Sequence, residues 1–180
     1  MIRVVVTGSE CTGKTTLVKA LAEHYETVCV PEFIRGFVIE KDAPPTYEDV
    51  EPIARGQMAL EDEHISVGTR LLIHDTDLLS AVVYNHHYYG ECPGWIEDAC
   101  AKRAADLYLL AGIDVPWIAD GWLRDRGDRR EEMQELFRNA LLDRRLNFTE
   151  IRGEHHERLA EAVSAIDSLI LGRAAKQRLR

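Results

Sequence analysis

Several features of other protein classes are missing from this 180-residue sequence. No apolar run approaches the roughly 20 residues that a membrane helix needs, and the chain starts on a predicted strand without the basic region and cleavage site of a secretion signal. The four cysteines show no C-x-x-C spacing, and the adjacent histidines His86-His87 diverge on a helix, so no zinc site is predicted. We therefore expect a cytoplasmic protein with no membrane partner and with reduced cysteines.

The sequence also lacks an excess of positive charge. Its net charge is −9 and its isoelectric point is about 5.3, whereas nucleic-acid-binding proteins gain most of their affinity from basic residues against phosphates. We therefore expect no nucleic-acid partner and a small-molecule phosphate ligand instead. Hydrophobic residues make up 46% and charged residues 29% of the chain, which is typical of one globular domain over residues 1–180. The sequence leaves open whether the protein forms a homo-oligomer.

The strongest motif lies within the first 21 residues. An apolar run at residues 2–6 precedes the pattern G-x-x-x-x-G-K-T and a stretch of helix-forming residues. The glycines of such a loop let successive backbone N–H groups point at phosphate oxygens at the start of a helix. Lys14 adds a charge at the β- and γ-phosphates, and the Thr15 hydroxyl can bind a magnesium ion. The predicted ATP-binding residues are Gly8, Ser9, Glu10, Cys11, Thr12, Gly13, Lys14, Thr15 and Thr16.

Short apolar runs alternate with helical patterns along the rest of the chain. Five strands are predicted, at residues 2–6, 27–30, 70–74, 107–110 and 147–151. Helices are predicted around them, at residues 16–21, 32–40, 46–68, 78–83, 95–105, 130–144 and 154–171. This alternation predicts an α/β fold, a three-layer P-loop NTPase sandwich around a five-stranded parallel sheet. By analogy with P-loop kinases, we expect the strand order 2-3-1-4-5 and ligands at the carboxyl ends of the strands.

Carboxylates follow two of the predicted strands. Asp75 ends the third strand, where an acid can join Thr15 in a magnesium site. Asp77 could bind the substrate or only favour the start of its helix. Glu32 could accept the proton of an attacking hydroxyl, a role also open to the two aspartates, or merely form a surface pair with Arg35. The predicted catalytic residues here are Lys14, Glu32 and Asp75, and the predicted substrate ligands are Glu32, Arg35 and Asp77.

An arginine-rich segment with two glycines covers residues 120–130. Such a segment can close over a kinase site as a lid, exclude water and place positive charge on the transferring phosphoryl group. A solvated loop with internal Asp–Arg pairs is the alternative. Arg124 is the first choice for a catalytic and ATP-binding arginine, ahead of Arg126, Arg129 and Arg130.

Aromatic residues could stack on a flat base, and the candidates are Tyr84, Tyr88, Tyr89, Trp95, Trp117 and Trp122. Among them, Tyr84 and Trp117 are the predicted substrate contacts. Adenine contacts are expected after the fifth strand, around Arg152-Gly153, by analogy of fold.

The order of these motifs resembles the ribosylnicotinamide kinase domain of the NadR-type bacterial NAD-biosynthesis regulators, within the small P-loop nucleoside and metabolite kinases. Besides the phosphate loop, the matching segments are Glu32-x-x-Arg35, Ile53-Ala54-x-x-Gln57-x-x-x-Glu61, Asp75-Thr76-Asp77, Asp114-Val115-Pro116-Trp117 and Asp120-Gly121-x-x-Arg124. They occur in the family's order and cover nearly the whole chain. The Asp-Thr-Asp segment and the segment from Pro-Trp to Asp-Gly are more specific to this family than the phosphate loop, which many unrelated proteins share.

The resemblance implies ATP- and Mg²⁺-dependent phosphorylation of the 5′-hydroxyl of nicotinamide riboside to nicotinamide mononucleotide, with Asp120 as a further substrate ligand. It does not extend to the DNA-binding and adenylyltransferase parts of those regulators, because no H-x-G-H signature occurs in this sequence. Another nucleoside or metabolite acceptor is the first alternative. An ATPase switch without a small-molecule acceptor is the second, although the N-K-x-D signature of GTPases is absent.

Overall fold

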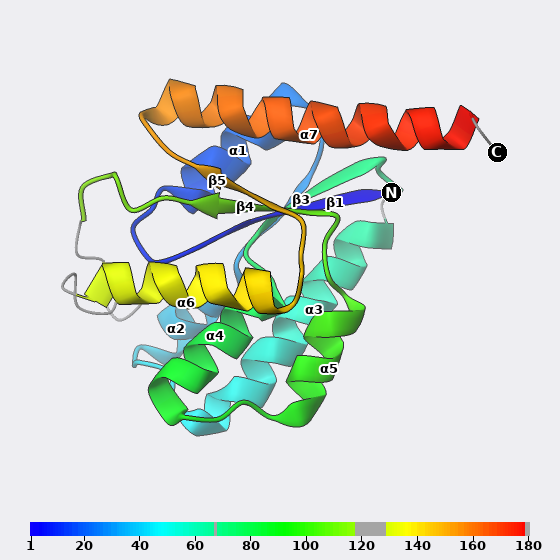
Figure 1. Ribbon diagram of the computed structural model, residues 1–180. Coiled ribbons are helices and arrows are strands. Elements are labelled where there is room, and N and C mark those ends of the chain that lie inside the picture. The colour runs from blue at the N-terminus through cyan, green and yellow to red at the C-terminus, as the bar shows by residue number, and fades with distance from the viewer. Residues whose placement is uncertain (67, 118–128, 179–180) are drawn as a thin grey trace.

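The computed structural model describes residues 1–66, 68–117 and 129–178. Its centre is a five-stranded parallel sheet with the order β2-β3-β1-β4-β5 (Figure 1). The strands are β1 (Ile2–Thr7), β2 (Cys29–Val30), β3 (Leu71–Asp75), β4 (Leu107–Ala111) and β5 (Phe148–Ile151). The predicted α/β sandwich and its strand order are therefore confirmed, and the carboxyl ends of the strands meet at one edge of the sheet.

Helices cover both faces of the sheet (Figure 1). One face carries α1 (Lys14–His24) and α7 (His155–Arg178). The other face carries α3 (Val50–Ser66), α4 (Leu78–Tyr89), α5 (Gly94–Lys102) and α6 (Arg130–Asp143), with α2 (Phe33–Lys41) packed on α3. The result is the three-layer arrangement that the alternation of strands and helices predicts.

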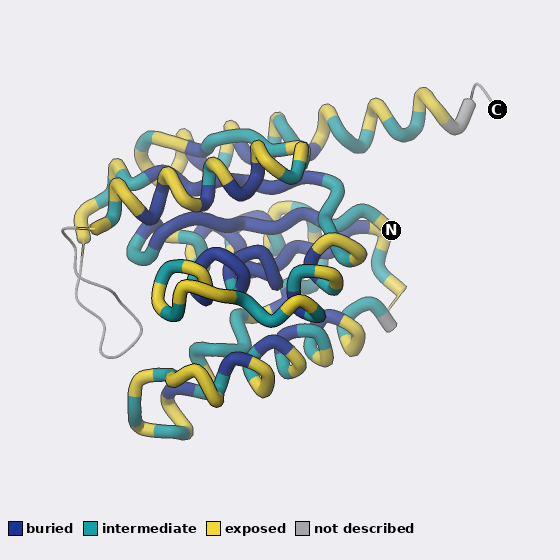
Figure 2. The backbone as a smooth tube through the Cα atoms, turned by 60° about the horizontal axis from the view of Figure 1, so that its bottom comes forward, coloured by how far each residue is buried: buried dark blue, intermediate teal, exposed yellow. Residues whose placement is uncertain are grey.

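Side chains that alternate along the central strands give the sheet two apolar cores. On β1, Val4 and Val6 pack with α1 and α7, whereas Val5 packs with α4, α5 and α6. Figure 2 shows that the buried residues lie at the centre of the molecule, with exposed residues on the outer surfaces of the helices. Because the central strands are buried on both faces, they form continuous apolar runs in the sequence.

Three helices differ in detail from the sequence expectation. Helix α4 continues through its aromatic residues to Tyr89 and ends at Gly90, whose φ is 76°. Helix α7 reaches Arg178 instead of residue 171, and its last turns project beyond the sheet (Figures 1 and 2). Thr46 forms the expected cap, but through a short 3-10 turn, η1 (Tyr47–Asp49), that precedes α3. No helix in the described part of the chain is long and apolar enough to cross a membrane.

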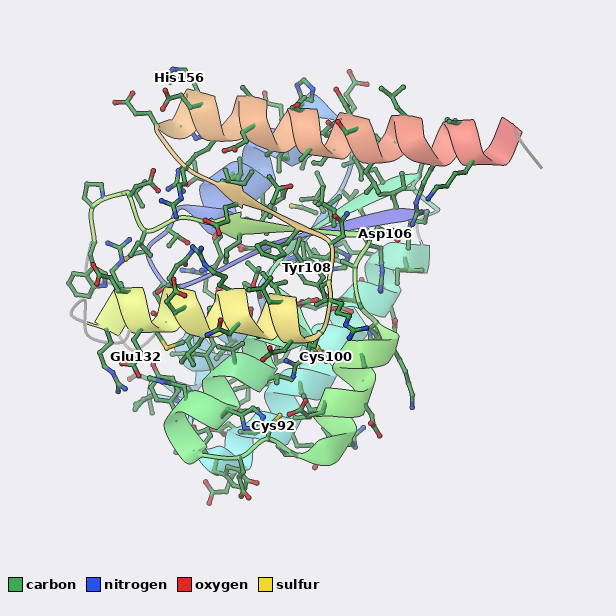
Figure 3. The ribbon with its side chains drawn as sticks, viewed as in Figure 1. Cys92, Cys100, Asp106, Tyr108, Glu132 and His156 are labelled. Carbon is green, nitrogen blue, oxygen red and sulfur yellow. The ribbon has the colours of Figure 1, made fainter. Side chains whose placement is uncertain are left out.

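Buried polar side chains tie α4 to the sheet and α3 to the end of α5. Asp77 accepts hydrogen bonds from Leu79 N (3.0 Å) and from the Tyr108 hydroxyl (2.8 Å). Tyr108 belongs to β4, on the sheet face that α6 covers (Figure 3). Burial raises the pKa of Asp77 to about 6, and its two hydrogen bonds oppose this rise. On α3, the buried Glu61 accepts from Arg103 Nε at 3.0 Å. These contacts fix both helices against the core.

A glycine and a side-chain amide hold α2 against α3. The ring of Phe33 occupies the space that a Cβ on Gly56 would take. At the next position, Gln57 Oε1 accepts a hydrogen bond from Phe33 N at 2.9 Å. Glu32 is the N-cap residue of α2 and directly precedes Phe33. The contacts with α3 therefore determine where Glu32 is presented.

We expect Gly56→Ala to lower the free energy of unfolding by about 1–2 kcal/mol, because the new methyl group overlaps the Phe33 ring and this overpacking outweighs a gain in helix propensity of up to about 1 kcal/mol. Urea unfolding measures the effect. The matched control is Gly36→Ala in α2, where a Cβ meets nothing within 4 Å, so this substitution is expected to leave stability unchanged or to raise it. Equal effects of both substitutions would contradict the packing argument.

Candidate active site

The segment between β1 and α1 forms a tight loop. Gly8 (φ 126°) and Gly13 (φ 76°) have backbone conformations that favour glycine. A Cβ on Gly8 would also lie 2.9 Å from the carbonyl oxygen of Ala111, so the loop approaches the end of β4 more closely than a side chain allows. Thr12 Oγ1 donates to Ser9 O at 2.9 Å within the loop. The loop leads into the N-terminus of α1, which is suited to binding anions.

Lys14 begins α1, and its ammonium group lies across the loop. Its Nζ donates to the carbonyl oxygens of Gly8 (3.0 Å) and Ser9 (2.7 Å). A phosphate bound by the loop would compete with these two carbonyls for the same charge. Ser9 is buried, whereas Thr16, two residues after Lys14, is exposed. The roles of Lys14 and Thr16 as ATP ligands both stay predictions.

Thr15 and Asp75 come together as the sequence predicts. Thr15 Oγ1 donates to Asp75 Oδ2 at 2.6 Å. The second carboxylate oxygen, Asp75 Oδ1, is buried and has no hydrogen-bond partner among the described residues. A hydroxyl and a carboxylate with an unshared oxygen are the hard oxygen donors that Mg²⁺ prefers, so these two residues fit that ion. Within the described ranges, three or more His, Cys, Asp or Glu side chains do not gather into a metal site.

Arg158, on α7, binds the backbone of the phosphate loop. Its guanidinium donates to the carbonyl oxygens of Thr12 (2.6 Å), Gly112 (3.0 Å) and Gly153 (2.8 Å), and it pairs with the Asp114 carboxylate. Arg158 is only 4% exposed. The loop, the end of β4 and the turn between β5 and α7 are thus joined by one side chain. Sequence reasoning missed this residue, because nothing in its local pattern distinguishes it from a solvated helix arginine.

A second arginine, Arg130, also contacts the backbone of the loop. Its Nη2 donates to Cys11 O (3.3 Å) and its Nη1 to Val115 O (3.0 Å). Cys11 has the left-handed backbone conformation, with φ 54°. The sequence analysis ranked Arg130 below Arg124, which falls outside the described residues, as does Asp120. Arg130, the last arginine of the predicted lid segment, is therefore one of the described arginines that contact the loop.

A cavity of about 490 Å³ adjoins the phosphate loop, within the size range of small-molecule sites. Loop residues including Lys14 line it, together with residues of helices α2, α3 and α4. Three tyrosines of α4, Tyr84, Tyr88 and Tyr89, line it. Trp117, which is 38% exposed, does not appear on the described wall, and Trp95 lies under the Arg55 guanidinium (4.6 Å to the ring centroid).

Glu32 lines this cavity beside the loop. Its side chain is 18% exposed and pairs with Arg35 Nη2 at 3.3 Å. Burial raises the pKa of Glu32, Asp75 raises it further, and the charges of Lys14 and Arg35 oppose the rise. Glu32 therefore has the predicted Arg35 partner and also lines the same cavity as Lys14, while its role as a base stays a prediction. A buried carboxylate with a raised pKa is a suitable acceptor for a proton.

Two further predicted substrate residues also lie at the cavity. Asp77 lines it, but both of its carboxylate oxygens are engaged by Leu79 N and Tyr108, as described above. Burial, followed by the charge of Glu10, raises the pKa of Tyr84 far above its usual range, and the Glu10 carboxylate accepts a hydrogen bond from its hydroxyl. The rings of Tyr84 and Tyr88 are stacked, with centroids 6.0 Å apart and an 11° angle between planes. Both tyrosines line the cavity.

Comparison with known proteins identifies the family and supports the fold. A family model described as an AAA domain matches residues 3–158. The trifunctional NAD biosynthesis/regulator protein NadR of Escherichia coli (strain K12) is 27% identical over 160 residues, which are 86% of this chain and 39% of that protein. The chain therefore spans less than half the length of this curated relative.

Two crystal structures of NadR have the same fold. The structure of NadR in complex with NR has a TM-score of 0.79 and 22% identity. The structure in complex with NAD and AMP-PNP has a TM-score of 0.77 and 21% identity. Each alignment covers 93% of this chain and 49% of the NadR chain. Since the family model covers most of the sequence, the chain belongs to the AAA domain family, and its fold is that of the matching part of NadR.

Proposed function

We propose that this chain is an ATP-dependent kinase that phosphorylates the 5′-hydroxyl of nicotinamide riboside and forms nicotinamide mononucleotide. The observation that carries the proposal is the cavity that adjoins the phosphate loop, because Glu32, a carboxylate with a raised pKa, and Lys14 of the loop both line it. A nucleotide switch needs no such enclosed second site. The names of the similar proteins support the acceptor, since NadR is a NAD biosynthesis protein and has been crystallised with NR and with AMP-PNP.

The loop and its neighbours hold the donor nucleotide in this proposal. Backbone N–H groups at the start of α1 and the Lys14 ammonium bind the β- and γ-phosphates. Thr15 and Asp75 would hold Mg²⁺, which when bound neutralises charge that develops on the phosphates. Arg130, already against the loop backbone, adds positive charge from α6.

Glu32 acts on the acceptor. The 5′-oxygen attacks the γ-phosphorus and its proton passes to the Glu32 carboxylate, while the bond from phosphorus to the β,γ-bridging oxygen breaks and ADP leaves. Arg35, paired with Glu32 at 3.3 Å, orients the carboxylate. The residues expected to complete the site from the lid segment at 120–130 are Arg124, as an ATP ligand, and Asp120, as a substrate ligand. Residues 1–180 act as one kinase domain in this proposal.

The first test is ADP release from Mg·ATP in the presence of nicotinamide riboside, of common ribonucleosides and deoxynucleosides, and of no acceptor. We expect turnover that depends on nicotinamide riboside. We also expect Lys14→Ala to lower kcat/KM at least about a hundredfold, because a preorganised charge on the phosphates is lost, with little change in the melting temperature. ADP release at the same rate without an acceptor would replace the kinase by an ATPase switch, and selective turnover of another nucleoside would change the acceptor alone.

Glu32→Gln is expected to lower kcat by about 10²–10⁴-fold, because the amide cannot accept the proton. The wild-type rate should fall as the pH decreases through the raised pKa of Glu32, so this acid limb should lie at a higher pH than that at which an ordinary glutamate titrates. The variant should lose this limb. Profiles of kcat against pH measure both effects, and the fold is checked by circular dichroism. A variant with wild-type kcat would move the base role to Asp75 or Asp77.

Arg130→Ala is expected to raise the KM for ATP and to lower kcat at least about tenfold, because a guanidinium beside the phosphate loop is removed. Arg130→Lys should restore part of the activity through its charge. The matched control is Arg129→Ala, since the neighbouring arginine is 45% exposed and pairs with Glu132 at 2.9 Å. Steady-state kinetics with varied ATP are the measurement, and equal kinetics for the Arg130 and Arg129 variants would contradict the assignment.

A further inference from the structure

Arginines bind the carbonyl oxygens of two consecutive residues in the phosphate loop. Arg158 Nη1 donates to Thr12 O at 2.6 Å, and Arg130 Nη2 donates to Cys11 O at 3.3 Å. The two arginines differ in burial, since Arg158 is 4% exposed and Arg130 is half-buried. The proposed reaction uses the charge of Arg130 and leaves the buried Arg158 without a role.

The Arg158 guanidinium uses all three of its nitrogen atoms. Besides the bond from Nη1 to Thr12 O, its Nε donates to Gly153 O at 2.8 Å, and its Nη2 donates to Gly112 O at 3.0 Å and to the Asp114 carboxylate. A guanidinium is planar, so its donors have fixed directions relative to one another. The partners at the ends of β4 and β5 therefore fix the direction of the bond to the loop.

A bond to the Thr12 carbonyl also determines where the next N–H group points. No cis peptide bond occurs in the described part of the chain, and in a planar trans peptide the C=O and the following N–H point in opposite directions. Because Thr12 O faces the Arg158 guanidinium, the Gly13 N–H faces away from it. Arg158 lies directly behind this peptide, since a Cβ on Gly13 would be 4.0 Å from Arg158 Nη1.

The backbone around this peptide has the form of an anion site. Cys11 (φ 54°) and Gly13 (φ 76°) both have the left-handed conformation, and turns of this kind make successive N–H groups converge on an anion. Gly13 is also the N-cap residue of α1, at the helix end that favours negative charge. The Gly13 N–H therefore belongs to the groups that bind a donor phosphate in the proposed function.

We propose that Arg158 is a positioning residue for the phosphate donor, because it holds the Thr12–Gly13 peptide with the Gly13 N–H directed at a donor phosphate. The inference rests on the proposed function and deepens it, since it assigns a residue to the preorganisation of the donor site. Arg158 acts through the backbone and makes no contact with the donor. A loop that already has its binding geometry loses less conformational freedom when the ligand binds.

The test measures the dissociation constants of Mg·ATP and of magnesium-bound inorganic triphosphate, which has the three phosphates without the nucleoside. Arg158→Met should raise both constants about 10–100-fold, because a misdirected N–H loses a hydrogen bond to a charged group. The KM for the acceptor should stay close to the wild-type value. Isothermal titration calorimetry and steady-state kinetics are the measurements. A rise for Mg·ATP alone would place the effect at the nucleoside and overturn the proposal.

A second variant separates direction from charge. Arg158→Lys keeps the positive charge but carries its donors on one nitrogen, which cannot bind the three backbone segments together. Triphosphate should therefore bind this variant more weakly than the wild type. In protein labelled with ¹⁵N-glycine, saturating triphosphate should move the Gly13 N–H signal downfield in the wild type and less so in Arg158→Lys. Wild-type affinity with an equal signal shift would show that charge alone matters, and would overturn the proposal.

The matched control is Arg173→Met. Arg173 also lies on α7 and also binds a backbone carbonyl, Met1 O at 3.2 Å, and an aspartate, Asp106. Its contacts are with the amino-terminal end of β1 and the segment before β4, not with the loop. We expect this variant to lower the melting temperature and to leave both dissociation constants unchanged. Equal losses of triphosphate affinity in the Arg158 and Arg173 variants would indicate a general loss of structure and contradict the positioning role.

The outcomes also separate this inference from the proposed function. A wild-type protein that binds Mg·ATP and triphosphate but phosphorylates no acceptor would overturn the kinase function, while the same binding data would still decide the role of Arg158. A wild-type protein that binds neither ligand would overturn both. Turnover of nicotinamide riboside with unchanged triphosphate affinity in the Arg158 variants would leave the kinase function standing and overturn the inference alone.

Discussion

The candidate site depends on the parallel pairing of β1 with β3. Val6 lies opposite Asp75 in this pairing, so the loop that follows β1 and the acid that ends β3 emerge side by side. The hydrogen bond of 2.6 Å between Thr15 and Asp75 is a consequence of that register. The register is maintained by apolar side chains buried on both faces of the sheet. The position of the proposed metal ligands is therefore determined by the core rather than by the loop itself.

The core alone does not fix the shape of the phosphate loop. Its backbone carbonyls are bound by Arg158 at Thr12 and by Arg130 at Cys11, from helices α7 and α6. The arginine on α7 is 146 residues away from its loop partner in the sequence. Both helices start close to the carboxyl edge of the sheet, and so their first turns can reach the loop. In a chain of net charge −9, this local positive charge favours binding of an anionic nucleotide.

Sequence patterns were sufficient for the sheet and for the phosphate loop, because continuous apolar runs and a spaced glycine motif are local signals. They also predicted correctly that Thr15 and Asp75 lie together, since both lie at the carboxyl ends of strands in one parallel sheet. They were insufficient for Arg158 and Gln57, whose roles come from contacts between distant elements. The spacing of Ile53, Ala54 and Gln57 does place these residues on one helix face, but only the packing of α2 shows that this face borders a cavity. The expected roles of Arg124 and Asp120 lie in the part of the chain that the structure does not describe.

The surroundings of Glu32 connect nucleotide binding with the proposed base chemistry. Burial and the nearby Asp75 charge raise its pKa, while the Lys14 ammonium opposes the rise. A nucleotide phosphate that pairs with Lys14 would draw that charge away from Glu32, and the negative phosphates would raise the Glu32 pKa further. A base becomes more effective as its pKa approaches the working pH. In the proposed reaction, the binding of the phosphoryl donor in the loop would therefore make Glu32 a stronger base for the acceptor's proton.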